Sequence, residues 1–219
     1  MPKTSFLLNR EIILSDLINL KMYMRALKVI SYTILGKDMP VISPDRNVLE
    51  QKILPYFIQE KEFAKVLFAG CGSYTKHYEK WFKHKEEYST IDINPFKKLY
   101  GAKKHIVDSY SNVGNYFPAN YLDVIICHGI FGFGWNERKD VEQGFAGSFK
   151  CLRDGGILVV GWRDTPATKP FPLETCQSLS QFKPFVFPPV LTSQLVLEKY
   201  LNITDGTEKH VFNFYIKSP

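Results

Sequence analysis

The chain has 219 residues, of which 45% are hydrophobic and 23% are charged, and its formal net charge is +6. That length suits one domain, alone or with a small appendage, and the composition excludes a disordered chain and a collagen. Four cysteines lie far apart without zinc-finger spacing, so we expect reduced thiols and a cytoplasmic protein. No apolar stretch has the length of a membrane span, and charges interrupt the N-terminal apolar pattern, so we expect neither a transmembrane segment nor a signal peptide.

The positive charge is unevenly distributed along the chain. Lysine and arginine outnumber aspartate and glutamate only within residues 1–104, where the lysines are scattered. The densest run, residues 76–85, falls on a predicted helix, and a solvated helix face is the ordinary reason for such a run. The charge by itself therefore does not point to a nucleic acid.

The first sixty residues have helical patterns. Residues 11–35 predict an amphipathic helix, because apolar side chains recur at 13, 17, 20, 24 and 27. A helix that lies on a membrane is the alternative, which Glu11 and Asp16 weaken. A second helix is predicted over residues 46–60, with Asp45 as its N-cap. We expect residues 1–60 to form a helical appendage or lid, and residues 61–219 to form the main domain.

From residue 63 onward, short apolar runs alternate with segments of helical length. Nearly uninterrupted runs rich in Val and Ile are typical of strands buried on both faces, and their alternation with helices predicts a doubly wound α/β fold. The predicted strands are 65–70, 88–93, 105–108, 122–127 and 156–162, and the segments between them are 74–86, 95–103, 110–120 and 136–153. After a proline-rich loop at 166–190, residues 195–201 and 211–216 predict a closing pair of elements.

The first predicted strand runs into a Gly-x-Gly turn at Gly70 and Gly72. Such a turn brings the backbone close to a ligand and directs free N–H groups at it. Asp92 ends the next strand, 20 residues after Gly72, which is the spacing at which a carboxylate accepts hydrogen bonds from ribose hydroxyls. The combination predicts an adenosine-containing cofactor, with a purely structural turn as the alternative. A dinucleotide site would have a third glycine where Thr75 stands, which disfavours a nicotinamide-dependent oxidoreductase.

Five segments within residues 63–162 resemble, in the same order, those of the class I, Rossmann-like S-adenosylmethionine-dependent methyltransferases. The segments are VLFAGCGS, STIDINP, HIVDS, LDVIICHG and LRDGGILVV. The resemblance implies a mostly parallel, seven-stranded sheet, S-adenosylmethionine as cofactor and methyl transfer as activity. The cofactor-binding residues that it implies are Gly70, Cys71, Gly72, Asp92, Ile93, Asp108, Ser109 and His128. In that arrangement Asp92 holds the ribose, Ile93 packs on the adenine and Asp108 binds the adenine amino group.

The chain departs from the family pattern at two positions. Phe68 stands where the family usually has an acidic residue, and Tyr74 stands at the third glycine of the loop. These departures leave open a catalytically inactive, methyltransferase-like binding protein.

The methyl acceptor is expected to be a small molecule. Family members that methylate nucleic-acid bases usually carry Asn/Asp-Pro-Pro-aromatic after the fourth strand, and this chain does not, so an RNA methyltransferase is the weaker alternative. A single acidic residue, Asp164, follows strand five, so we expect no catalytic metal. His128 ends strand four and is the candidate catalytic base, which favours oxygen over nitrogen as acceptor atom; a local hydrogen bond is the alternative role.

Aromatic residues and an arginine follow the fourth and fifth predicted strands, where ligands bind in open α/β sheets. Aromatic faces attract cations such as the cofactor's sulfonium, so these side chains are candidates for the substrate pocket, with an ordinary core role as the alternative. The candidates are Phe131, Phe133, Trp135, Trp162 and Arg163.

Overall fold

The computed structural model describes residues 43–200 and 207–218, together with scattered residues between 20 and 35. The chain divides into two compact units, residues 1–40 and residues 41–219. In the first unit the described residues from Leu20 to Ile34 are helical, in agreement with the predicted helix, whose other residues lie outside the described part. Among the described residues, no helix combines the length and the hydropathy that a membrane span requires.

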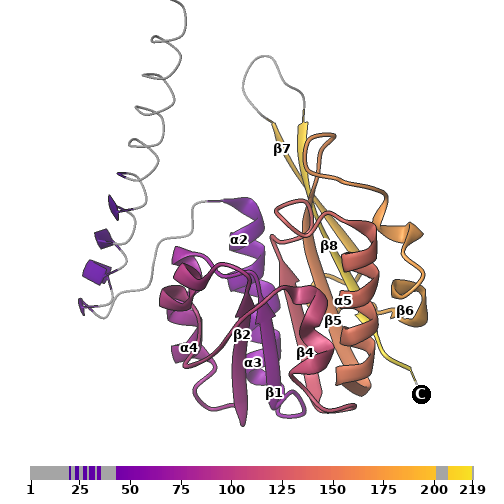
Figure 1. The fold of residues 1–219 in the computed structure, drawn as a ribbon, viewed down its shortest axis with the longest axis horizontal. Helices are drawn as coiled ribbons and strands as arrows, with labels where there is room; N and C mark the ends of the chain where they lie inside the picture. The colour runs from indigo at the N-terminus through magenta and orange to yellow at the C-terminus, as the bar shows by residue number, and fades with distance from the viewer. Residues whose placement is uncertain are drawn as a thin grey trace, which may run out of the picture. The chain divides into compact units, whose positions relative to one another are not determined.

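The second unit is built on one mixed sheet, with the strand order β3-β2-β1-β4-β5-β8-β6 and with β7 also paired to β8. Strands β1 to β5 are parallel to one another, and β8 pairs antiparallel with β5, β6 and β7. The strands are β1 (Lys65–Ala69), β2 (Glu87–Asp92), β3 (Lys104–Val107), β4 (Leu122–His128), β5 (Leu152–Asp164), β6 (Lys183–Pro184), β7 (Gln194–Tyr200) and β8 (Thr207–Ile216). The predicted α/β class and mostly parallel sheet are confirmed (Figure 1).

The described part of the chain contributes eight strands rather than seven. The additional strand arises because β6 and β7 pair with different parts of β8: residues 183–184 lie beside 215–216, and residues 194–200 lie beside 207–213. Strands β6 and β7 thus both lie along β8 at one edge of the sheet.

Most connections between the strands are single turns. The predicted helices at 95–103 and 110–120 contain 3₁₀ turns, and 74–86 contains a 3₁₀ turn and one α-helical turn. The helical elements are α2 (Pro44–Val48), η1 (Leu49–Ile53), α3 (Leu54–Gln59), η2 (Ser73–His77), α4 (Tyr78–Trp81), η3 (Pro95–Tyr100), η4 (Tyr110–Asn115), α5 (Arg138–Cys151), η5 (Leu173–Thr175) and η6 (Leu179–Gln181).

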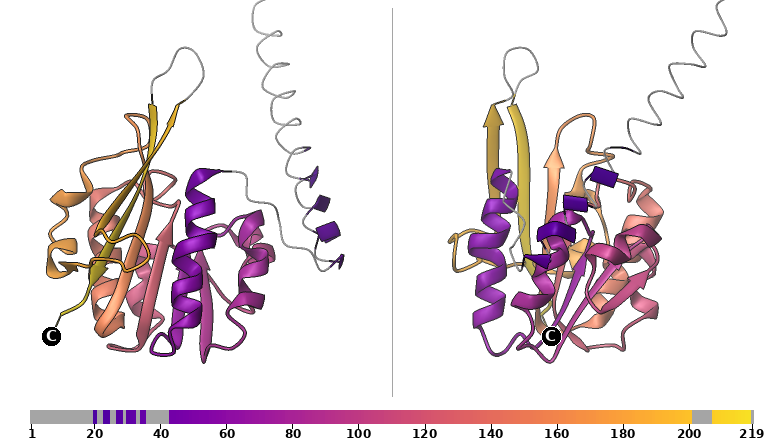
Figure 2. Two further views of the ribbon diagram at one scale, coloured as in Figure 1. Left: turned by 180° about the vertical axis from the view of Figure 1, so that it is seen from behind. Right: turned by 90° about the vertical axis from the view of Figure 1, so that its left-hand side faces the viewer.

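The two faces of the sheet carry separate hydrophobic clusters. Side chains alternate along β1, so Leu67 packs in the cluster with α5, while Val66 and Phe68 pack in the cluster with α2, η1 and α3. Figures 1 and 2 show α5 on one face and the α2–α3 helix on the other. All seven residues of β4 are buried, as expected for the central strand of such a sheet.

Helix 44–59 belongs to the same compact unit as the sheet. Elements α2, η1 and α3 follow one another without a break, and four of their apolar side chains have no exposed surface: Leu49, Ile53, Leu54 and Phe57. The expected appendage of residues 1–60 is therefore divided in the structure, with the boundary after Pro40. The helix also begins earlier than expected: Ser43 is at the N-cap position and Pro44 is the first helical residue, which places Asp45 in the first turn.

The burial of Phe57 provides a test of this packing. Phe57→Ala should lower the free energy of unfolding by about 3–5 kcal/mol, because it leaves a cavity between the helix and the sheet. Phe96→Ala is the matched control, since Phe96 is 77% exposed, and its cost should stay within about 0.5 kcal/mol. Urea unfolding of the full chain measures both values, and equal effects would contradict the packing described here.

Candidate functional site

A cavity of about 380 Å³ opens at the carboxyl ends of the parallel strands; we call it the edge cavity. Its walls are the segments that follow β1, β2, β3 and β4, and it spans the point between β1 and β4 where the strand order reverses. Ligands bind at such a point in open α/β sheets. The predicted site residues that line it are Gly70, Cys71, Asp92, Ile93, Ser109, Phe133 and Trp135.

Gly70 has a backbone conformation and a neighbour that exclude a side chain. Its φ is +93°, and a Cβ atom at this position would lie 2.3 Å from the backbone oxygen of His128. The turn after β1 therefore lies directly against the end of β4. This contact brings the Gly-x-Gly loop and His128 to the same edge of the sheet.

Asp92 is held in place by the two loops beside it. The Cys71 N–H donates to Asp92 Oδ2 at 2.8 Å, and the Asn94 N–H donates to Oδ1 at 2.9 Å. Each carboxylate oxygen retains capacity for a second donor. Asp92 lines the edge cavity and is only partly buried, so its carboxylate is positioned to accept hydrogen bonds from a ligand's hydroxyls.

Next to Asp92, Ile93 offers an apolar surface. Its side chain lines the edge cavity and is 68% exposed, which is high for an isoleucine beside a buried strand. Across the cavity lies the buried Trp135, whose Nε1–H donates to Ser111 Oγ at 3.1 Å. A flat aromatic ring fits against such apolar walls.

Cys71 lines the edge cavity but is not a nucleophile. Burial raises the pKa of its thiol to about 12. What it contributes is the backbone N–H that holds Asp92.

Three of the residues expected to bind the cofactor do not line the edge cavity. They are Gly72, Asp108 and His128. The Asp108 carboxylate accepts hydrogen bonds from the Ser109 N–H, the Asn112 amide and the Tyr116 hydroxyl, all on its own turn. The Tyr116 hydrogen bond is the main cause of the lowered pKa of Asp108. The carboxylate thus stabilises this turn instead of facing the cavity.

Gly72 is covered by the tyrosine that replaces the family's third glycine. A Cβ at Gly72 would lie 2.5 Å from the Tyr74 ring, so the ring rests directly on the loop. Tyr74 lines the edge cavity, and the guanidinium of Arg46 lies 3.0 Å from its ring centroid. Burial raises the pKa of Tyr74 to about 12. Tyr74 is therefore a wall of the cavity that the glycine pattern does not indicate.

The five candidate pocket residues separate into two groups. Phe131 and Trp162 lie in the core: Phe131 has no exposed surface, and the Trp162 indole donates to Asn213 at 2.9 Å. Phe133 is half exposed, and the Arg163 guanidinium lies 5.4 Å from its ring centroid. Phe133 and Trp135 line the edge cavity, whereas Arg163 lines a second, smaller one.

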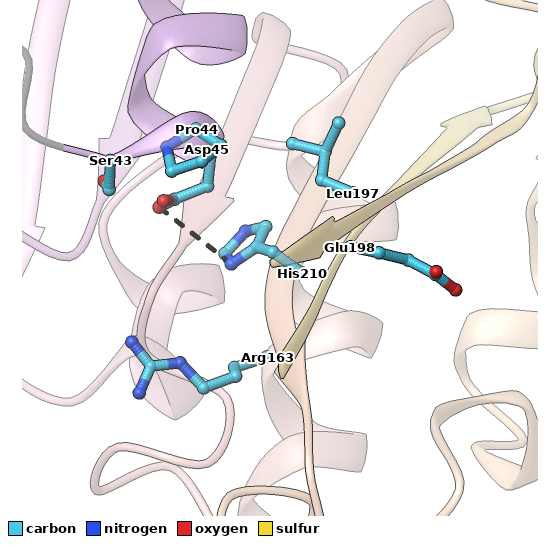
Figure 3. A pocket seen from close by; sticks show the side chains of 7 residues that line it. All are labelled: Ser43, Pro44, Asp45, Arg163, Leu197, Glu198 and His210. Carbon is cyan, nitrogen blue, oxygen red and sulfur yellow. Dashed lines mark ion pairs between the residues drawn. The ribbon is translucent and has the colours of Figure 1, made fainter. Parts of the chain in front are cut away.

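The second cavity, the histidine cavity, has a volume of about 60 Å³. Its lining residues are Ser43, Pro44, Asp45, Arg163, Leu197, Glu198 and His210. In Figure 3 the Asp45 carboxylate and the His210 imidazole face one another, while the Glu198 carboxylate points away from both. Burial by itself raises the pKa of Asp45, but the neighbouring His128 and Ser43 side chains and the His210 ring together hold it well below its usual value.

His128 lies beside this cavity, buried at the end of β4. Its Nε2 is 3.6 Å from Asp45 Oδ2, and its ring centroid is 5.2 Å from that of His210. Burial is the main cause of the lowered pKa of His210, and the nearby His128 ring is the second cause. The sequence predicted Asp45 as a helix cap and assigned no role to His210. In the structure, the pairing of β8 with β5 sets His210 opposite Arg163.

The fold is similar to those of solved S-adenosylmethionine-dependent methyltransferases. One from Methanosarcina mazei aligns with a TM-score of 0.53 at 15% identity, covering 82% of this chain and 99% of that chain. The N-methyltransferase NodS from Bradyrhizobium japonicum gives 0.51 at 12% identity, with coverages of 80% and 99%. A TehB-like methyltransferase from Corynebacterium glutamicum gives 0.50 at 17% identity, with coverages of 86% and 95%.

No protein-family model and no curated protein sequence matches the chain. The similarity to solved structures is one of fold. It confirms the Rossmann-like methyltransferase fold that the five sequence segments implied.

The contact at Gly70 can be tested against a second glycine with positive φ. Gly134→Ala should cost about 1 kcal/mol of unfolding free energy, because φ is +104° but nothing lies within 4 Å of the added methyl group. Gly70→Ala should cost at least about 1 kcal/mol more, because its methyl group also meets the His128 carbonyl. Chemical denaturation measures the difference, and equal costs would show that the close contact with β4 is absent.

Proposed function

We propose that the chain is an S-adenosylmethionine-dependent methyltransferase and that the cofactor binds in the edge cavity. The observation that carries the proposal is the Asp92 carboxylate, which two backbone N–H groups hold at the cavity wall beside the Gly70 turn. The methyltransferase fold supports it. In this arrangement Asp92 binds the ribose hydroxyls and Ile93 packs against the adenine.

The methionine part of the cofactor would lie along the Gly70 turn, towards the end of β4. Gly70 and Tyr74 line this part of the edge cavity. In the reaction the methyl group leaves the sulfur as it bonds to the acceptor, which leaves neutral S-adenosylhomocysteine. The protein contributes mainly the approach geometry of the two reactants.

We propose that the acceptor atom is a hydroxyl oxygen of a small molecule. A hydroxyl must lose its proton as the new bond forms, and His128, directly before the cavity residue Gly129, is the base that would take it. Phe133 and Arg163 would contact the acceptor, and Arg163 favours one that carries negative charge. The four buried free cysteines are consistent with the reducing cytoplasm as the compartment.

Two observations favour a second candidate, the inactive binding protein. Tyr74 rests on Gly72 where the family has a small residue, and Phe68 is fully buried where the family has a carboxylate. A tyrosine in this place narrows the room for the methionine end of the cofactor. The titration below distinguishes the two candidates.

Calorimetric titration of the full chain with S-adenosylhomocysteine should give binding in the micromolar range, and NADH should give none. Asp92→Ala should weaken the binding by more than tenfold, about 1.4 kcal/mol, because the ribose hydroxyls lose their acceptor. Asp154→Ala is the matched control, since Asp154 is exposed near the amino end of β5, at the opposite edge of the sheet.

Absence of binding by S-adenosylhomocysteine would support the inactive binding protein and reject the enzyme. Unchanged affinity in Asp92→Ala would reject the cofactor placement alone. The thermal unfolding of each variant shows whether it is folded.

The acceptor atom can be tested with paired compounds. We expect methylation of phenols and not of the matching anilines when the chain is incubated with S-adenosylmethionine and each compound, because only the hydroxyl requires the base. Mass spectrometry of the products measures the transfer. Exclusive methylation of the anilines would reject the oxygen assignment, and methylation of RNA would reject the small-molecule class.

A further inference from the structure

Three side chains from three distant parts of the chain meet beside the histidine cavity. Asp45 comes from the first turn of α2, His128 from the end of β4 and His210 from β8. Asp45 Oδ2 lies 3.6 Å from His128 Nε2 and 3.9 Å from His210 Nδ1. One nitrogen or oxygen from each of the three residues falls within 4.8 Å of the other two.

The imidazole nitrogens in this cluster lack the hydrogen bonds that burial normally demands. Among the described residues, neither ring nitrogen of His128 has a hydrogen-bond partner, although the residue is only 3% exposed. His210 Nε2 is buried without a partner in the same part of the structure. Buried polar atoms are nearly always satisfied, so His128 Nε2, the unpartnered nitrogen that faces Asp45, indicates a missing partner.

The fold holds the His128 ring in position. Gly161 lies opposite His128 in the β4–β5 pairing, and a Cβ on Gly161 would come within 2.5 Å of His128 Cδ2. The ring therefore occupies the space that a side chain at position 161 would fill. It also stacks on Phe212 of β8, with a centroid distance of 5.6 Å and an interplanar angle of 13°. These contacts fix the orientation of the ring.

We propose that Asp45, His128 and His210 bind one divalent transition-metal ion, for which zinc is the best fit. Two imidazoles and one carboxylate are a ligand set that zinc takes in proteins. Ligand atoms at zinc-bond length lie about 3.3 Å apart in a tetrahedral site, so the cluster must contract by on the order of 1 Å when the ion binds.

Three protein ligands leave one zinc position open, and the space beside the cluster suits it. The histidine cavity lies next to Asp45 and His210, and Arg163 lines it (Figure 3). An oxygen ligand on the ion, whether water or an anionic group, would enter this space and meet the Arg163 guanidinium. With the ion bound, His128 would serve as a ligand and not as the base. The ion would then lower the pKa of an acceptor hydroxyl coordinated to it, and the proton of that hydroxyl would pass to solvent water. Metal binding itself does not depend on methyl transfer.

The test uses the full chain after removal of metals with a chelator. Zinc titrated in competition with a chromophoric chelator should bind with one ion per chain and submicromolar affinity. His210→Ala and Asp45→Asn should each weaken the affinity by at least about 100-fold, because each removes one of three ligands. His84→Ala is the matched control, since His84 is exposed and outside the cluster, and its affinity should equal that of the unmodified chain.

A second measurement separates ligand loss from misfolding. One equivalent of zinc should raise the melting temperature of the unmodified chain and of His84→Ala, but not that of Asp45→Asn, which keeps the size of the side chain. Cobalt should give a visible spectrum with nitrogen and oxygen ligands and no thiolate band. Three results would each overturn the proposal: zinc binding by the unmodified chain that is no tighter than binding by His210→Ala, equal zinc affinity in all variants, or a cobalt spectrum with a thiolate band.

Discussion

The carboxyl ends of β1 and β4 lie so close together that residue 70 has no room for a side chain, since a Cβ there would meet the His128 carbonyl at 2.3 Å. This contact fixes the turn after β1 at the point where the strand order reverses. On one side of it, the Cys71 N–H holds the Asp92 carboxylate at the edge cavity. On the other side, the His128 ring lies over Gly161 and against Phe212. Both halves of the proposed site depend on this one approach of two strands.

The two cavities differ in the chemistry that their walls offer. The edge cavity has backbone turns, one carboxylate and exposed apolar side chains such as Ile93, which suit a nucleoside with a charged tail. The histidine cavity has a carboxylate, an imidazole and a guanidinium in a much smaller space. They meet where Phe133, from the first, lies beside Arg163, from the second. A methyl donor bound in the edge cavity and a methyl acceptor near the histidine cavity would face each other across Phe133 and Arg163.

Local patterns were sufficient to predict the elements that depend on neighbouring residues in the sequence. The Val- and Ile-rich runs predicted the parallel strands, and Gly70 and Asp92, which the sequence named for a cofactor site, both line the edge cavity. Asp108 shows the limit of such reasoning: its position after β3 is the expected one, but Tyr116 and Asn112 draw its carboxylate into its own turn. Phe131 and Trp162 likewise belong to the core, because their rings pack against each other and both side chains are buried.

The residues that escaped prediction are those that only the tertiary structure brings together. Asp45 looks like a helix cap in the sequence, since nothing local shows that its helix packs on the sheet with that turn beside β8. His210 acquires neighbours only through the antiparallel pairing of β8 with β5. The most direct test of the account is a crystal structure of the chain with S-adenosylhomocysteine. We predict the ribose hydroxyls against the Asp92 carboxylate and the adenine beside Ile93; a ligand bound elsewhere, or an edge cavity that stays empty at saturating ligand, would contradict it.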